Sequence, residues 1–525
     1  MPRELYLPSR INSGGLNLNS EATTKAIVQK MMPYFTQEYP GKDQDFPIRS
    51  PSNKSRMLGS RTLLQPQQCQ TAISEAYEFF PVWAATHVKK RSQLLYNLAD
   101  KIEDARYELM ALLMMETGKT LQSAHAEVRE AVDFCRYYAQ QAVEKLSEPV
   151  PLVSPTGEEN WLELLGRGVF VCISPWNFPV SIFIGQIAAA LVAGNCVIAK
   201  PATLGELCAR KVASLIIDAG FPREAIHFTP CSVSIFSTLV LSDPRISGVV
   251  FTGSLDSAQD INRQLAQRAG SLPVVIAETG GQNAMIVDST ALPEQVATDA
   301  IVSAFDCAGQ RCSALRVLFI QEEIAHEVID LISGRMQLLK VGDSVSLDID
   351  VGPVISDTQQ QKVLRHIDGM SQTGKILSQT PLPKALLETG FYVPPTLIEI
   401  HHLKDLKEEV FGPVLHVIRF KGSQLNDVVR QINEAQYGLT LGIQSRIDSR
   451  VKTLTKKLAI GNIYINRNMV GAVVGSQPFG GQGLSGTGPK AGGPHYLLRF
   501  VVEKTVSNNT AAIGGNTQLL SLHRA

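Results

Sequence analysis

The residue whose type and setting first suggest chemistry is Cys312, in the run Gly309-Gln310-Arg311-Cys312-Ser313. Covalent catalysis at a carbonyl group needs a soft nucleophile that adds to carbon and later leaves as a thiolate. Only a few per cent of free thiols are ionised at neutral pH, so a reactive site must favour the anion, here through Arg311 or a helix terminus. The alternative for any single cysteine is a buried structural thiol, and Cys307 is an example.

A carboxylate that can act as a base stands upstream, at Glu278 in the run Glu278-Thr279-Gly280-Gly281. It follows the apolar run Val274-Val275-Ile276-Ala277, which predicts a buried strand. Ligands of α/β proteins bind at the carboxyl end of such strands, so a carboxylate and two glycines predict an open site there. The alternative is a solvated glutamate at the end of a strand.

A neutral hydrogen-bond donor follows another predicted strand, in the run Ser174-Pro175-Trp176-Asn177-Phe178-Pro179. The amide of Asn177 can donate to the oxyanion that develops when a nucleophile adds to a carbonyl. On its own, the run would be a loop that two prolines stiffen.

Two further strand ends fit a dinucleotide. Lys200-Pro201 follows the run Val197-Ile198-Ala199, and Phe251-Thr252-Gly253-Ser254 opens a predicted helix with a glycine and a hydroxyl. Free N–H groups at a helix N-terminus accommodate a pyrophosphate. No G-x-G-x-x-G motif follows these strands, so we expect a variant dinucleotide cleft.

The elements that must position these groups alternate in type along the chain. Residues 71–146 have the apolar spacing of helices, and short β-branched runs then alternate with helical stretches. A second alternating series runs from residue 284 to about residue 470. We therefore expect two α/β domains: a dinucleotide-binding domain of residues 46–148 and 165–279, and a catalytic domain of residues 280–490.

Two other parts of the chain lie outside these series. Residues 1–45 are polar and predict an N-terminal arm with one helix after Ser20. Residues 149–164 and 491–525 are expected to form an oligomerisation flap and a C-terminal tail. The alternating run Arg499-Phe500-Val501-Val502-Glu503 predicts an edge strand there, which could serve subunit pairing.

Composition and charge argue against several classes of function. The 525 residues include 49 basic and 49 acidic ones, so no net field attracts nucleic acid or an anionic membrane surface. Polar and turn residues interrupt the uncharged stretch of residues 179–199, which predicts a buried helix, a turn and a strand rather than a membrane span. Eight cysteines without a C-x-x-C pair or a histidine cluster at zinc spacing predict a reducing cytoplasm and no metal site.

Five motifs occur in an order that resembles the aldehyde dehydrogenase superfamily. They are Ser174-Pro175-Trp176-Asn177, Lys200-Pro201, Phe251-Thr252-Gly253-Ser254, Glu278-Thr279-Gly280-Gly281 before Cys312, and Glu408-Glu409-Val410-Phe411-Gly412-Pro413-Val414. The resemblance covers about residues 45–505. It implies a Rossmann-type dinucleotide-binding domain, an α/β catalytic domain and an oligomerisation hairpin, in a homodimer or larger homo-oligomer.

The resemblance also implies a mechanism and a substrate class, an aldehyde. Cys312 would add to the aldehyde, and Asn177 and the backbone N–H of Cys312 would hold the oxyanion. Hydride would pass to the cofactor and leave a thioester, and Glu278 would activate the water that hydrolyses it.

The implied cofactor is NAD(P), lying across the first sheet. Lys200 would bind the adenine ribose, Ser254 the pyrophosphate and Glu409 the nicotinamide ribose, while Phe411 would pack near the nicotinamide ring. The other residues implied to contact the cofactor are Ser174, Pro175, Trp176, Ala202, Thr203, Thr252, Gly253 and Gly280.

One of these residues departs from the family pattern. Three residues after Lys200, where many relatives have a glutamate that binds the ribose diol, this sequence has Thr203. A carboxylate would repel a 2′-phosphate, whereas a hydroxyl can donate a hydrogen bond to it. NADP is therefore acceptable, although the resemblance favours NAD.

Within the superfamily, the sequence most resembles L-glutamate γ-semialdehyde (1-pyrroline-5-carboxylate) dehydrogenase, which completes proline catabolism. The runs that carry this resemblance are Gly309-Gln310-Arg311-Cys312-Ser313-Ala314-Leu315-Arg316, Asn466-Arg467, Gly471-Ala472-Val473-Val474-Gly475 and Gln477-Pro478-Phe479-Gly480-Gly481. The residues implied to contact the substrate are Glu130, Phe183, Arg311, Ser313, Gly471, Ala472 and Phe479.

The implied contacts fall into two groups, one for the amino-acid end of the substrate and one for its aliphatic stem. Ser313, Gly471 and Ala472 would hold the amino-acid end, because small residues expose N–H groups that can bind a carboxylate. Phe183 and Phe479 would flank the aliphatic stem. Without the resemblance, Gly471-Ala472 could equally be a flexible loop.

The arm adds one more resemblance. Residues 10–18 are similar to the connector of bifunctional proline-utilisation proteins, where it follows a flavin-dependent proline dehydrogenase module that this sequence lacks. The arm therefore implies a link to such a flavoprotein module.

Three alternatives share part of the pattern. A dehydrogenase for another small acidic semialdehyde, such as succinate semialdehyde, would keep the catalytic residues without the amino-acid anchor. A non-catalytic scaffold would have lost the nucleophile or the base, yet Cys312 and Glu278 are both present. A CoA-acylating enzyme would pass the thioester to a thiol, whereas Glu278 favours hydrolysis.

Overall fold

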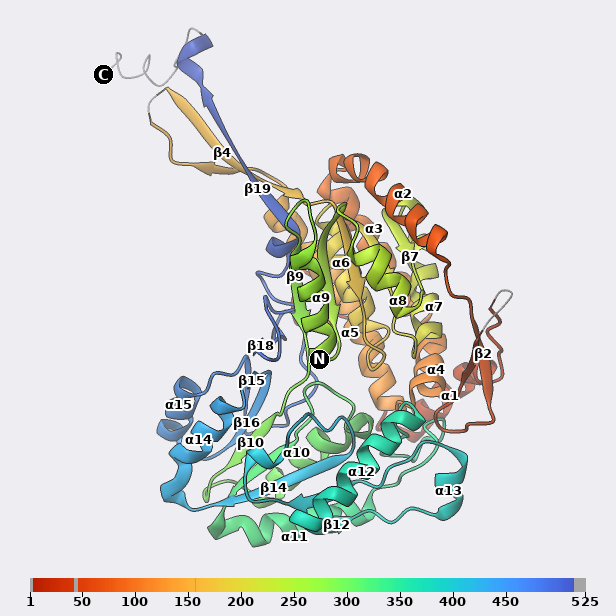
Figure 1. Ribbon diagram of the computed structural model, residues 1–525, viewed down its shortest axis with the longest axis vertical. Coiled ribbons are helices and arrows are strands. Elements are labelled where there is room, and N and C mark those ends of the chain that lie inside the picture. Colours follow the sequence, from red (N-terminus) through yellow and green to blue (C-terminus); the bar gives the residue numbers. More distant parts are fainter. Residues whose placement is uncertain (1–2, 42–45, 156, 514–525) are drawn as a thin grey trace.

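The computed structural model describes residues 3–41, 46–155 and 157–513, in which two parallel-stranded sheets form separate layers (Figure 1). The first sheet has five parallel strands, in the spatial order β7 (Ile226–Phe228), β6 (Cys196–Lys200), β5 (Val169–Ile173), β8 (Ile246–Thr252) and β9 (Val274–Glu278). The central strands β5 and β6 are buried along their whole length, as expected for parallel strands covered on both faces. The predicted α/β class is confirmed.

Helices cover this sheet on both faces. They are α2 (Pro66–Ala85), α3 (Val88–Asp104), α4 (Arg106–Thr117), α5 (Leu121–Leu146), α6 (Ser181–Val192), α7 (Glu206–Asp218), α8 (Val233–Ile235) and α9 (Leu255–Gln267). Gly118 caps the C-terminal end of helix α4 and adopts a left-handed conformation (φ 70°). The helical spacing predicted for residues 71–146 is confirmed, and the buried residues of α5 include Val128, Ala139 and Ala142.

The N-terminal segment packs onto this first unit. Ser20 caps α1 (Glu21–Phe35), as predicted, and the apolar face of α1 lies against α4 in the first hydrophobic core. A hairpin of β1 (Phe46–Arg49) and β2 (Met57–Arg61) follows. Residues 1–2 and 42–45 of the predicted arm lie outside the described residues.

The second sheet has seven strands and its own core. Their order is β12 (Lys375–Gln379), β13 (Thr396–Glu399), β14 (Val414–Phe420), β11 (Val317–Gln321), β10 (Ala284–Val287), β16 (Thr440–Gln444) and β17 (Asn462–Ile465), and only β12 runs antiparallel to its neighbour. Its helices are α10 (Pro293–Phe305), α11 (Glu322–Leu338), α12 (Asp357–Thr373), α13 (Lys384–Thr389), α14 (Leu425–Glu434) and α15 (Asp448–Lys457), and a short pair joins β15 (Tyr437–Gly438) to β18 (Gln482–Gly483). The first core contains residues up to Ala277 and again Val474 and residues within the 496–501 segment, whereas the second core begins at Ala284.

A third sheet stands away from both layers (Figure 1). It pairs β19 (Val501–Asn509) with β4 (Glu158–Gly166) and β3 (Val150–Leu152), all antiparallel, and β19 forms an edge. The start predicted for the edge strand is wrong: residues 497–500 form a 3-10 turn, because the buried ring of Phe500 packs 5.1 Å from Phe170 before the chain extends. Residues 156 and 514–525 of the predicted flap and tail lie outside the described residues.

The stretch of residues 179–199 folds as predicted, with α6, a turn and β6. Within the described ranges, no helix is both long and apolar enough to cross a membrane. The same ranges contain no group of three or more histidine, cysteine or acidic side chains placed to hold a metal ion.

Candidate active site

The turn that carries Cys312 has an unusual backbone. Between the end of α10 and β11, three consecutive residues adopt a left-handed conformation: Cys307 (φ 53°), Ala308 (φ 54°) and Gly309 (φ 68°). Such conformations are uncommon for residues with a side chain and are maintained only by surrounding contacts. At Gly309 a Cβ would overlap the carbonyl of Gly412, so this position needs glycine. We call residues 306–316 the nucleophile turn.

A buried ion pair holds this turn. Asp306 accepts hydrogen bonds from the backbone N–H of Cys307 (2.8 Å) and from the Ser123 hydroxyl (2.7 Å), and pairs with Arg311 at 2.6 Å. Burial opposes ionisation of Asp306, but these partners, Arg311 first, hold the pKa of its carboxyl below the usual value. Asp306 was not predicted, because its role depends on contacts with α5 that the local sequence does not show.

The thiol of Cys312 is half-buried, and its ionisation is disfavoured. Burial, followed by the carboxylates of Glu409 and Glu278, raises the pKa of Cys312 to about 12, although Arg311 and Arg316 lower it. Arg311 therefore acts in the expected direction, but its effect is smaller than that of burial and the two carboxylates. The charge of Arg311 is already balanced by Asp306, so burial and the two carboxylates outweigh it.

The carboxyl of Glu278 lies at the end of β9, close enough to Cys312 for its charge to act on the thiol. One oxygen accepts from the backbone N–H of Gly481 at 2.8 Å, and the other is buried without a partner among the described residues. A Cβ at Gly480 or Gly486 would come within 2.8 Å of the carboxyl, so glycines make room for it. Burial raises the pKa of Glu278 to about 8, and the N–H of Gly481 and the charge of Lys490 only partly offset this.

Asn177 joins the end of β5 to the nucleophile turn. Its side chain is 8% exposed, and its amide donates a hydrogen bond of 3.0 Å to the carbonyl of Gln310, two residues before Cys312. An amide nitrogen carries two hydrogens. Among the described residues, neither the second hydrogen nor the backbone N–H of Cys312 has an acceptor, so both are available to a group that adds to the thiol.

The ends of β5 and β6 lie side by side and carry two polar groups without strong partners. The backbone N–H of Ser174 donates to the carbonyl of Lys200 at 3.2 Å, while the hydroxyl of Ser174 is buried and unpartnered within the described part of the chain. The Lys200 ammonium donates to the Pro201 carbonyl at 3.3 Å and lies 5.4 Å from the ring centre of Phe236. Burial lowers the pKa of Lys200.

The N-terminus of α9 opens next to these strand ends. Ser254 caps α9, as the sequence predicts, and accepts from the N–H of Ser257 at 3.3 Å while remaining exposed. The N–H of Gly253 donates to the Glu278 carbonyl at 3.1 Å, and Gln186 binds the Thr252 hydroxyl at 3.0 Å, so this end is fixed beside β9. After β6, Ala202 is half-buried and Thr203 is exposed.

Glu409 and Phe411 reach the same site from the second unit. Glu409 pairs with the buried Arg316 at 3.0 Å, and a Cβ at Gly280 would overlap its carboxylate. The ring of Phe411 meets Trp176 edge to face at 5.6 Å. Arg316, which sequence reasoning named only within a motif, therefore connects Glu409 with the nucleophile turn.

These groups fit a dinucleotide. The strand ends and Phe411 supply a buried cation, an exposed helix N-terminus, an aromatic pair and a hydroxyl without a partner among the described residues. These are groups that can bind a ribose, a pyrophosphate and an aromatic ring.

The predicted substrate residues differ in burial and come from several parts of the chain. Glu130 is half-buried, and burial raises its pKa to about 7, against a hydrogen bond from Ser181. Ser313 is buried directly after the nucleophile, and Phe479 pairs by its backbone with Ala491. The residues Gly471 (φ 76°, exposed) and Ala472 (half-buried) lie in a loop without regular structure.

Phe183 is a wrong prediction. Its ring is fully buried (0% exposed) inside α6 and meets Phe228 edge to face at 6.2 Å, so it cannot contact a substrate. The ring beside the nucleophile turn is instead that of Phe178, which is half-buried, 3.7 Å from the Lys119 ammonium and 5.3 Å from the Arg311 guanidinium. Its position directly after Asn177 is a signal in the sequence that could have identified it.

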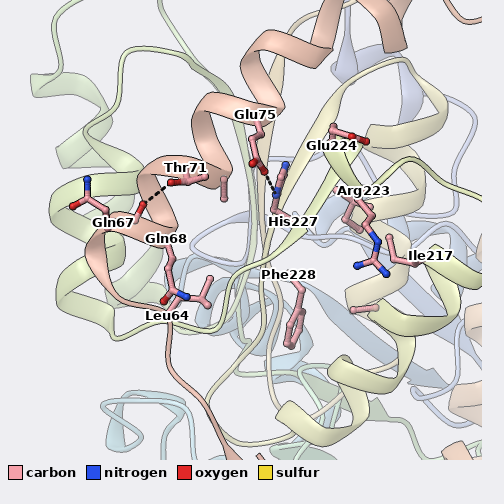
Figure 2. Close-up of a pocket in the computed structure, with 13 residues that line it drawn as sticks. Leu64, Gln67, Gln68, Thr71, Glu75, Ile217, Arg223, Glu224, His227 and Phe228 are labelled. Carbon is pink, nitrogen blue, oxygen red and sulfur yellow. Dashed lines mark hydrogen bonds and ion pairs between the residues drawn. The ribbon is translucent and has the colours of Figure 1, made fainter. Parts of the chain in front are cut away.

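The cavity drawn in Figure 2 is separate from this site. It has a volume of about 690 Å³ and lies between α2, α7 and the edge strand β7, where Glu75 faces His227 at 3.7 Å. None of the predicted site residues lines it. The chemistry therefore belongs to the strand ends around Cys312.

Comparison with known proteins agrees with the fold. The family description "Aldehyde dehydrogenase family" matches residues 39–506, and this chain belongs to that family. The bifunctional protein PutA of Salmonella typhimurium is 42% identical over 522 residues, which cover 96% of this chain and 38% of that protein. The 1-pyrroline-5-carboxylate dehydrogenase of a Geobacillus species is 34% identical over 467 residues, covering 87% of this chain and 89% of the relative.

A solved structure shows the same architecture. The 1-pyrroline-5-carboxylate dehydrogenase from Thermus with bound NAD has a TM-score of 0.90 and 32% identity, covering 96% of this chain and 100% of that one. The chain spans about two fifths of the length of the bifunctional relatives that it matches.

Proposed function

We propose that this chain oxidises L-glutamate γ-semialdehyde, which is in equilibrium with 1-pyrroline-5-carboxylate, to L-glutamate with NAD as the hydride acceptor. The observation that carries the proposal is the shared site of Cys312 and Glu278, a thiol and a carboxyl whose charges interact across the end of β9. The relatives named 1-pyrroline-5-carboxylate dehydrogenase, which this chain matches over most of their length, support the choice of substrate.

The side chains divide the reaction between them. The Cys312 thiol gives up its proton to solvent and its sulfur adds to the aldehyde carbon, while the free N–H groups of Asn177 and of the Cys312 backbone donate to the developing oxyanion. The bound dinucleotide supplies the hydride acceptor, so that a thioester is left on Cys312. Glu278 then takes a proton from water, which attacks the thioester carbonyl and releases the thiol. A pKa of about 8 suits a base that works near neutral pH.

The strand ends support the cofactor contacts that we propose. Lys200 and Ser174 would bind the adenine ribose, Ser254 the pyrophosphate, and Glu409 and Phe411 the nicotinamide riboside. Pro175, Trp176, Ala202, Thr203, Thr252, Gly253 and Gly280 would complete the cleft. Thr203 is exposed beside it and leaves NADP acceptable.

For the substrate, we propose that Ser313, Gly471 and Ala472 hold the amino-acid end. Phe178, in place of Phe183, would flank the aliphatic stem together with Phe479. Glu130 would lie at the rim. Arg311 forms an ion pair with Asp306 and lies beside Phe178. It would therefore affect substrate binding indirectly, by positioning the Phe178 ring and the nucleophile turn.

The test is a steady-state assay of glutamate γ-semialdehyde and succinate semialdehyde, each with NAD and with NADP. We expect glutamate γ-semialdehyde with NAD to have the highest kcat/KM, because only this substrate uses the amino-acid anchor. Equal kcat/KM values for the two aldehydes would overturn the substrate assignment in favour of a general acidic-semialdehyde dehydrogenase. Product formation that requires coenzyme A would overturn hydrolysis.

We also propose how the chain is divided into domains and how it assembles with other subunits. Residues 46–148 and 165–279 would form the NAD-binding domain and residues 280–490 the catalytic domain. The projecting sheet of β3, β4 and β19 would pair subunits in a homodimer or larger homo-oligomer. The match to bifunctional PutA proteins supports a link to a proline dehydrogenase flavoprotein module, and eight free thiols suit a reducing cytoplasm.

A further inference from the structure

The start of the described chain is closed into a compact turn and fixed on α5. The backbone N–H of Arg10 donates to the Tyr6 carbonyl (3.1 Å), and that of Asn12 to the Arg3 carbonyl (2.8 Å). The following residue, Ser13, donates from its N–H and its hydroxyl to Asp133 of α5, at 2.7 and 3.0 Å. The arm therefore has a defined position next to the first unit.

From this turn the side chain of Arg10 reaches a segment near the C-terminal end of the described chain, at Val474. Arg10 is 6% exposed, and one end of its guanidinium donates to the Val474 carbonyl at 3.0 Å while the other donates to Asn12 at 2.7 Å. The guanidinium lies 3.8 Å from the ring centre of Tyr6 and 5.4 Å from that of Tyr137 on α5. A planar group with several fixed N–H donors can make these contacts at once, whereas a lysine ammonium cannot.

The segment that Arg10 contacts is the 466–478 loop, which lacks regular structure and contains the proposed anchor at Gly471 and Ala472. Gly475 has a φ of 84°, and a Cβ there would lie 2.7 Å from the Arg10 guanidinium, so the loop backbone comes unusually close to it. The hydroxyls of Tyr6 and Ser476 also form a hydrogen bond. Two side chains of the arm thus hold the same three-residue stretch of the loop.

We propose that Arg10 is a positioning residue that sets the 466–478 loop for binding the amino-acid end of the substrate. The inference rests on the proposed function for the identity of the substrate, but the contact between arm and loop does not. Arg10 touches neither the thiol nor the carboxyl of the reaction. It acts by holding the carbonyl of Val474, two residues after Ala472. This hydrogen bond fixes the loop backbone and therefore the direction in which the N–H groups of the loop point.

The kinetic test compares Arg10→Ala and Arg10→Lys with Lys25→Ala. Lys25 lies on the same N-terminal segment but pairs with Glu21 on the exposed face of α1. We expect Arg10→Ala to raise KM for glutamate γ-semialdehyde about tenfold, the usual consequence of losing a charge-assisted hydrogen bond, with kcat changed less than about twofold. KM for propanal, which has no carboxylate, should stay unchanged, Arg10→Lys should be intermediate, and Lys25→Ala should match the wild type.

Hydrogen exchange of the loop amides in the NAD-free protein gives a readout that needs no substrate. Arg10→Ala should speed exchange in residues 471–477 and leave that of β10 unchanged, while Tyr6→Phe should speed it less. Unchanged loop exchange, or equal losses of activity with both aldehydes, would overturn the proposal. A wild type that does not prefer glutamate γ-semialdehyde would instead overturn the proposed function, and the exchange measurement would still decide whether Arg10 holds the loop.

Discussion

The nucleophile turn and the 466–478 loop serve the same proposed site but are stabilised differently. The nucleophile turn is buried, has three consecutive left-handed residues and is held by the Asp306–Arg311 and Arg316–Glu409 ion pairs. The 466–478 loop is half-exposed, and its central contacts come from the arm, more than 460 residues away in sequence. Both segments therefore depend on distant parts of the chain: the nucleophile turn on buried partners from α5, Asn177 and Glu409, and the loop on the arm. On our proposal, the first set of contacts serves the chemistry and the second serves selectivity.

The largest expected effect comes from removing the proposed nucleophile in the nucleophile turn. Cys312→Ala should lower aldehyde oxidation by at least about a thousandfold, because no other group supplies the nucleophile. The matched control is Cys135→Ala, which changes a buried thiol on α5 and should keep most of the activity. Steady-state reduction of NAD measures both, and substantial activity in Cys312→Ala would contradict the assignment of the nucleophile.

The next effect tests the link between β5 and the nucleophile turn. Asn177→Ala should lower kcat about a hundred- to a thousandfold, since it removes one donor to the oxyanion. The same variant should change KM for NAD little. A loss confined to KM would mean that Asn177 serves binding rather than the oxyanion.

The pH dependence should report Glu278. The base must be deprotonated, and the pKa of Glu278 is about 8, so hydrolysis should become about tenfold faster from pH 6 to pH 7, about fivefold faster from pH 7 to pH 8, and level off above pH 9. The rate rises with pH in this range because burial favours the protonated carboxyl and so raises the pKa of Glu278. Single-turnover deacylation across this range measures the profile, and a rate that is already flat at pH 6 would show a base of ordinary pKa.

The smallest expected effect concerns the cofactor. Thr203→Glu should shift the ratio of kcat/KM values about tenfold towards NAD, because a carboxylate repels a 2′-phosphate and binds a ribose diol. Thr203→Ser keeps the hydroxyl and serves as the control. An unchanged NAD to NADP ratio in Thr203→Glu would show that this residue lies outside the ribose site.

Much of the site could be predicted because its groups follow strand ends. Asn177, Lys200 and Glu278 each come directly after a buried apolar run, and parallel strands bring their carboxyl ends to one edge. Residues whose partners come from another part of the chain could not be found in this way. Asp306 depends on α5, and Arg10 on the 466–478 loop. The prediction for Phe183 failed because nearly every side chain of α6 is buried. The largely apolar sequence of this helix therefore does not show which of its faces points towards the site.

Glu278→Gln, mixed with glutamate γ-semialdehyde and NAD and quenched within one turnover, gives the most direct test of the account. Glutamine keeps the shape of the side chain but cannot accept the proton of water, so the acyl group should accumulate. We predict a burst of NADH and a glutamyl thioester that peptide mass spectrometry locates on Cys312. Normal steady turnover without a burst, or an adduct on a different cysteine, would contradict the account.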